Sequence, residues 1–271
     1  MSDVRRSTLS AICVVAFGSA ASAADLPTMK GPPPAPTPPP IYSWTGFYGG
    51  LNAGFGWDGN DSAFSGNAPL AAFFAAGEFP TSVGTSSSGG LVGGQVGYNA
   101  QIAPSWVVGV ETDLDWADVR GSGTVTPPST FYAPFTTSAS KSLDWLGTAR
   151  VRGGFLPAPN VLVYATGGLA YGGVKESYST VATGLTYATC PANFTCSIGS
   201  DSSTRLGWAL GAGVEMALDA HWSVKAEYLF ADLGKQSATA LTTATGLPTA
   251  AFTASSNFED SIARVGLNYK F

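Results

Sequence analysis

The chain has 271 residues, of which 45% are hydrophobic, only 11% are charged and 34 are glycine. Its net charge of −5 argues against nucleic-acid binding, which requires a basic face. After residue 23 there is no run of about 18 apolar residues, so transmembrane helices are excluded as well.

The N-terminus has the features of a signal peptide, predicted over residues 1–23. Arg5 and Arg6 form a basic start, and residues 9–17 form an apolar stretch that is too short to span a bilayer. Ala-Ser-Ala at 21–23 is a small-residue cleavage site. A core helix or an uncleaved anchor is the alternative, but the short apolar stretch and its flanks favour export.

A proline-rich periplasmic linker is predicted over residues 24–43, before a barrel domain over residues 44–271. A run so rich in proline prefers an extended polyproline conformation and cannot join a sheet. Two roles are open for it: a passive spacer, or a contact with peptidoglycan or another periplasmic partner.

Eight segments with alternating apolar and polar residues follow, as expected for strands with one buried face. We predict them over residues 46–57, 89–99, 108–116, 143–155, 161–173, 204–217, 222–232 and 258–271. The connections alternate between long (58–88, 118–141, 174–203 and 233–257) and short (100–105, 156–160 and 218–221). Long loops on one side and short turns on the other are typical of an antiparallel barrel that crosses an outer membrane.

A soluble sandwich would show the same alternation, so other features must decide between the two folds. Most tryptophans lie near strand ends, as in the aromatic girdles of membrane barrels. The predicted strands have about 10–13 residues, enough to cross hydrocarbon at a tilt. The polar series is rich in glycine, which suits a narrow lumen better than a wet surface. The sequence therefore predicts an all-β protein, an eight-stranded antiparallel transmembrane barrel in the outer membrane.

The apolar series is assigned to the lipid and the other series to the lumen. In the strand over 143–155, for example, we place Leu143 and Trp145 on the lipid face and Asp144 inside. In the strand over 108–116, Glu111 and Asp113 face the lumen.

The inward charges form a candidate site, because unpaired charges in a tight interior would cost several kcal/mol each. Neighbouring strands can bring the acids of 108–116 to Arg150 and Arg152. A charged pore lining is one interpretation, and a salt-bridge network that plugs the barrel is the favoured one. The members are Glu111, Asp113, Asp115, Arg150, Arg152, Arg205, Glu215, Lys225, Glu227 and Arg264.

Cys190 and Cys196 remain once Cys13 leaves with the signal peptide, and they are predicted to form a disulfide. Two thiols with no nearby histidine make only half a zinc site, so no metal is expected. His221 is the only histidine and lies in a short turn. We therefore expect no catalytic residues, no cofactor and no enzyme activity.

The segments Trp44-Thr45-Gly46-Phe47-Tyr48-Gly49-Gly50, Val224-Lys225-Ala226-Glu227-Tyr228 and Val265-Gly266-Leu267-Asn268-Tyr269-Lys270-Phe271 resemble small outer-membrane β-barrel surface antigens of alphaproteobacteria. That family is similar in fold to the eight-stranded membrane domain of OmpA-like proteins. The resemblance implies that both termini are periplasmic. It also implies that Leu267, Tyr269 and Phe271 form the signal read by the barrel-assembly machinery. Functions carried by loops are not implied.

Three functions are open at this point. The favoured one is a structural and surface-display role in contact with outer-membrane lipid, in which a rigid barrel anchors the loops. The alternative is a small porin that passes ions or small solutes through the charged lumen. A lipid-modifying barrel enzyme is the least favoured.

Overall fold

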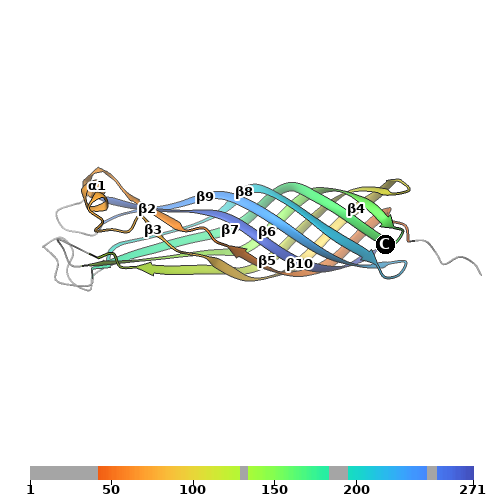
Figure 1. The fold of residues 1–271 in the computed structure, drawn as a ribbon, viewed down its shortest axis with the longest axis horizontal. Coiled ribbons are helices and arrows are strands. Elements are labelled where there is room, and N and C mark those ends of the chain that lie inside the picture. Colours follow the sequence, from red (N-terminus) through yellow and green to blue (C-terminus); the bar gives the residue numbers. More distant parts are fainter. Residues whose placement is uncertain (1–41, 129–133, 183–194, 243–248) are drawn as a thin grey trace, which may run out of the picture. The chain divides into compact units, whose positions relative to one another are not determined.

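The protein is a closed antiparallel barrel in a computed structural model that describes residues 42–128, 134–182, 195–242 and 249–271. Eight strands form the wall: β1 (Gly46–Asp58), β4 (Ser87–Ala103), β5 (Trp106–Val125), β6 (Phe135–Ala158), β7 (Val161–Ala182), β8 (Thr195–Ala217), β9 (Trp222–Leu241) and β10 (Ala251–Lys270). Each strand pairs with the next, and β1 pairs with β10, for example Leu51 with Leu267, which closes the sheet. The strands wind obliquely around one long barrel (Figure 1).

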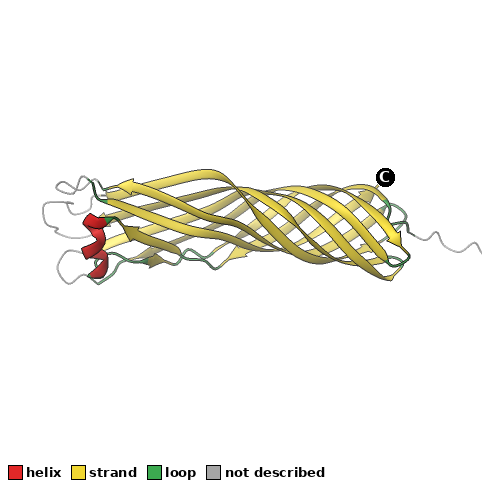
Figure 2. Ribbon diagram, turned by 90° about the horizontal axis from the view of Figure 1, so that it is seen from above, coloured by secondary structure: helices red, strands yellow, loops and turns green. Residues whose placement is uncertain are grey.

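The first long connection is itself folded, although the sequence predicts only a loop over 58–88. It contains β2 (Ser62–Gly66), α1 (Ala68–Ala75) and β3 (Ser82–Val83), and β2 pairs with the outer part of β10. Pro69 stands in the first turn of α1, where its missing N–H removes no helical bond. Figures 1 and 2 show α1 at the end opposite the C-terminus, which we call the loop end. We call the other end, with connections 104–105, 159–160 and 218–221, the short-turn end.

The strands are longer than predicted. Seven of the wall strands have 17 to 24 residues, and only β1 has 13. At about 3.3 Å per residue the longest measures roughly 80 Å, whereas a lipid-facing band is only about 25 Å tall. Most of the segments predicted as loops at 118–141, 174–203 and 233–257 are therefore strand. Hydroxyl pairs join neighbouring strands there, such as Ser140 with Ser177 at 2.8 Å.

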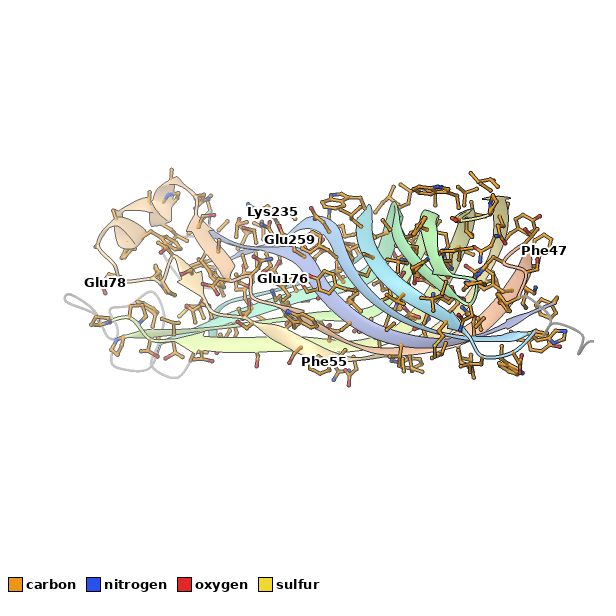
Figure 3. The ribbon with its side chains drawn as sticks, turned by 45° about the vertical axis from the view of Figure 1, so that its right-hand side comes forward. Phe47, Phe55, Glu78, Glu176, Lys235 and Glu259 are labelled. Carbon is orange, nitrogen blue, oxygen red and sulfur yellow. The ribbon has the colours of Figure 1, made fainter. Side chains whose placement is uncertain are left out.

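The outer surface changes character along this length. Apolar side chains project outward in the half near the short-turn end, as for Phe47 and Phe55, which are 68% and 52% exposed (Figure 3). Toward the loop end the outward positions become serine, threonine and charged residues, as at Arg120 and Lys175. The predicted strand ends thus mark the edge of the apolar band rather than the ends of the strands.

The alternation shifts at the edge of this band, and two face assignments are wrong for that reason. The β6–β7 register shifts between Leu143 and Trp145, as expected for a β-bulge, which changes the face that later residues present. Leu143 is therefore buried inside, not on the lipid face, and Asp144 lies at the surface in an ion pair with Lys175. Among described residues, no helix is long and apolar enough to cross a membrane.

Strands β8 and β9 separate toward the loop end. Their ladder runs from Ala217–Ser223 to Trp208–Asp232 and does not continue through the described residues beyond. There the Gln236 side chain spans the gap, accepting hydrogen bonds from Ser203 and Arg205 of β8. Side chains therefore connect β8 and β9 at this place.

Candidate functional site: a layered and ion-paired interior

Nine of the ten predicted inward charges lie in the lumen within the apolar band, and each is at most 4% exposed. Alternation along the strands explains their placement, because every second residue of a strand faces the lumen. They come from five strands, β5, β6, β8, β9 and β10: Glu111, Asp113, Asp115, Arg150, Arg152, Glu215, Lys225, Glu227 and Arg264. We call this set the ion layer.

The ion pairs cross the lumen as well as joining neighbouring strands. The Arg150 guanidinium on β6 lies 2.7 Å from Glu111 on the adjacent β5 and 2.9 Å from Glu227 on β9. Lys225 on β9 lies 2.8 Å from Glu111. Arg264 on β10 lies 2.9 Å from Asp113. Strands β7 and β8 lie between β6 and β9, and β5 stands four places from β9 in the eight-stranded wall, so these contacts connect opposite walls.

Two tyrosines complete the ion layer. The Tyr48 hydroxyl donates to Glu111 at 2.8 Å and accepts a hydrogen bond from Arg152 at 3.0 Å. The Arg152 guanidinium carbon also lies 3.9 Å from the centre of the Tyr164 ring, a cation–π distance. Both tyrosines fall on the inward series, so the alternation that found the charges could also have found them. Such neutral donors offset the one carboxylate that exceeds the number of cations.

Arg205 is the predicted member that does not join the ion layer. It faces inward but is only partly buried, and its Nε donates to the Gln236 side chain. Ten residues separate Arg205 from Glu215 on β8, about 33 Å along the strand. Alternation gives the face of a residue but not its height, and this is why the prediction placed Arg205 with charges at another level.

An apolar layer lies directly beyond the ion layer toward the loop end. Its buried members come from all wall strands except β1: Leu91, Ala117, Val119, Leu143, Leu146, Ala170, Val174, Ala209, Leu229, Ala231, Leu233, Phe258 and Ile262. On β1 a Cβ at Gly56 would lie within 3.2 Å of both Leu91 and Val119, so the layer packs against that wall too. The apolar side chains therefore reach around the whole lumen.

The loop end holds a further polar layer and an apolar cap. Lys141 pairs with Asp58 while its Nζ also donates to the Asn60 carbonyl at 2.8 Å. Beyond them Phe64 of β2, Leu70 of α1 and Phe252 of β10 share a buried cluster. The segment from β2 to β3 therefore closes this end. Neither the polar layer nor the apolar cap was predicted, because their residues fall in segments that the sequence predicts as loops.

Trp44 closes the short-turn end. It is 2% exposed, packs with Leu162 and Tyr164, and donates its Nε1–H to the Pro159 carbonyl at 3.0 Å. Gly46 then turns the chain into β1 at φ 144°, which favours glycine, so that Phe47 faces outward. The residue types of the Trp-Thr-Gly-Phe segment are thus explained by the buried tryptophan, the positive φ at glycine and the outward phenylalanine. Burial beside Trp44 raises the pKa of Tyr42 to about 12.

The other predicted residues that the structure describes lie near the two ends of the barrel. Leu267, Tyr269 and Phe271 all face outward on the last strand and its end. Cys196 is disulfide-bonded, but Cys190 lies outside the described residues, so their pairing stays a prediction. His221 stacks on Tyr269 with ring centroids 5.6 Å apart. Within the described ranges, no group of three His, Cys, Asp or Glu side chains is placed to hold a metal ion.

Known proteins share this architecture. Residues 10–271 match the family model for the outer membrane protein beta-barrel domain, and the chain belongs to that family. It is 33% identical to the 31 kDa outer-membrane immunogenic protein of Brucella melitensis biotype 1, over 98% of this chain and all of the relative. It is 25% identical to the 25 kDa outer-membrane immunogenic protein of Brucella abortus biovar 1, over 94% and 92% of the two chains.

Among solved structures, the outer membrane protein OprG of Pseudomonas aeruginosa is similar with a TM-score of 0.48 and 14% identity, over 85% of this chain and 98% of that one. The prediction of an outer-membrane β-barrel protein is confirmed by the family and by the fold. The apolar band is therefore the surface that meets the hydrocarbon of the outer membrane.

Proposed function

We propose that this protein is a non-enzymatic structural barrel that displays its loop end at the cell surface. The observation that carries the proposal is the filled lumen. The ion layer joins opposite walls, and the apolar layer packs against all eight wall strands. A water-filled path for solutes would have to break both layers.

The proposal includes an orientation. Residues 1–23 act as the signal peptide and residues 24–43 as a periplasmic linker, a spacer or a contact with peptidoglycan. The short-turn end then faces the periplasm and the long strand extensions rise above the outer surface. The barrel-assembly machinery would read Leu267, Tyr269 and Phe271. Immunogenicity, which the names of the Brucella relatives record for those proteins, supports a surface-exposed loop end here.

Surface labelling tests the display role. An epitope inserted at Gly77 should bind antibody on intact cells, because Gly77 is exposed at the loop end and a side chain there would meet open space. The matched insertion after Asp219, in an exposed short turn, should be reached only after the outer membrane is permeabilised. Labelling of the Asp219 insertion alone on intact cells would reverse the orientation.

Conductance in planar bilayers separates the closed barrel from the porin alternative. We expect the purified, folded protein to give no steady channels, because the ion pairs and the apolar layer exclude a continuous water column. Protein whose band on SDS gels shifts on boiling is folded. Large, reproducible single-channel steps from such protein would contradict the closed lumen and support the porin.

A further inference from the structure

We propose that the outer face of β5, β6 and β7 is a binding site for the phosphorylated sugar headgroup of an outer-leaflet lipid. A groove of about 460 Å³ lies on this face, and residues of these three strands line it. Its volume falls within the range of about 300–1,000 Å³ that is usual for small-molecule sites. The site rests on the orientation proposed above, with the loop end outside the cell, and does not depend on whether the lumen conducts.

The strand register places two cations on either side of a hydroxyl. Arg120 pairs with Ser142 across β5 and β6, and Ser142 pairs with Lys175 across β6 and β7. Because neighbouring strands lie about 4.8 Å apart, the two cationic side chains start roughly 10 Å from each other with Ser142 between them. A phosphate above Ser142 could receive charge-assisted hydrogen bonds from both sides.

The next row outward consists only of serine. Ser122 pairs with Ser140, and Ser140 pairs with Ser177, whose hydroxyl lies 2.8 Å from that of Ser140. Two residues along a strand correspond to about 7 Å, so these hydroxyls lie beyond the cations by roughly the length of one sugar unit. A row of small hydroxyls can both donate to and accept from sugar hydroxyl groups.

The height of the groove matches a headgroup. Trp116 and Trp145 pair across β5 and β6 on the same outer face, next to the groove on its hydrocarbon side. Tyr171 packs on Trp145 with ring centroids 6.0 Å apart. Such aromatic residues mark the membrane interface. Four residues separate Trp116 from Arg120, about 13 Å along the strand and roughly 10 Å along the membrane normal at the usual tilt. Arg120 therefore stands in the headgroup region.

The cations are available to a ligand. Arg120 pairs with Asp118 at 2.6 Å and Lys175 with Asp144 at 2.5 Å, but the two cationic side chains remain 72% and 57% exposed. Exposed pairs of this kind hold their partners weakly. Asp118 and Asp144 are the acids beside these two cations, so a phosphate dianion would compete with exposed carboxylates for Arg120 and Lys175.

Binding of diphosphoryl lipid A to the full-length protein in zwitterionic detergent micelles tests the site. We expect Arg120→Ala combined with Lys175→Ala to weaken binding at least about 20-fold, because each cation near an anionic surface contributes about fivefold to affinity. The loss should be smaller in high salt, which screens these charges. The matched control is Lys235→Ala, which removes an exposed cation of β9 outside the groove and should change affinity less than twofold. Heat-modifiable migration on SDS gels checks that every variant is folded.

Three outcomes would overturn the proposal. Equal affinity of the double variant and the wild type would remove the groove as the site. Equal loss with Lys235→Ala would show only a general charge effect. Binding of inorganic phosphate as tight as that of diphosphoryl lipid A would assign the groove to a free anion and not to a lipid headgroup.

Discussion

Replacing Arg150 with alanine is expected to lower the free energy of unfolding by about 3–5 kcal/mol, the usual effect of removing one partner from a buried ion pair. Its guanidinium lies 2.7 Å from Glu111, 2.8 Å from Asp113 and 2.9 Å from Glu227. Without Arg150 these carboxylates stay buried with fewer partners. Urea unfolding in micelles, followed by tryptophan fluorescence, measures the change.

The control for Arg150→Ala is Arg120→Ala, which breaks an exposed pair and should cost at most about 1 kcal/mol. A second arm adds Glu227→Gln to Arg150→Ala. Since the two residues are in direct contact, the double variant should lose less stability than the sum of the single losses, by about 0.5–3 kcal/mol.

The same measurement bears on function. A water-filled pore would solvate Arg150 and its partners, and its removal would then resemble a surface substitution. If Arg150→Ala costs no more than Arg120→Ala, the lumen is hydrated and the closed barrel that we propose is wrong.

Alternation made most of the wall and most of the ion layer predictable. Strands with one face toward hydrocarbon and one toward a narrow lumen must present every second residue inward, so Glu111, Arg150 and Arg264 could be assigned from spacing alone. Cross-lumen contacts are a different matter. Which acid meets Arg150 depends on strand tilt and stagger, which one sequence does not specify.

Heights and local shifts explain the errors. Arg205 has the correct face but lies about 33 Å along β8 from Glu215. Leu143 has the wrong face because a bulge follows it. Bulges leave no strong signal in composition, and the predicted strand ends were set by the loss of outward apolar residues. That loss reports the end of the lipid contact, whereas serine and threonine continue the ladder into water.

The side chains that close the two ends of the barrel could not be predicted from alternation either. Trp44 belongs to a segment that carries the family resemblance, and Phe64 and Leu70 fall in a segment predicted as a long loop. Each is an apolar side chain in an irregular stretch, where period-two reasoning does not apply. Their burial depends on the closed wall around them, so it appears only once the barrel is assembled in three dimensions.

Leu210→Arg is expected to destabilise the membrane-inserted barrel by about 2–4 kcal/mol, the range for a cation near the bilayer midplane. Leu210 is 58% exposed and lies near the middle of the outward apolar series of β8, which runs from Leu206 to Met216. An arginine at this position can make no ion pair without leaving the hydrocarbon. Urea titration in lipid bilayers, read by the SDS gel shift, gives the change.

Leu206→Arg supplies the matched control, because it makes the same chemical change on the same strand and face. Leu206 is 71% exposed and stands at the outer end of the series, where an arginine can reach water and should cost only about 0–1 kcal/mol. Depth in the membrane is the only systematic difference between the two sites. Equal costs would mean that water covers the apolar band, and the assignment of lipid and lumen faces would then be reversed.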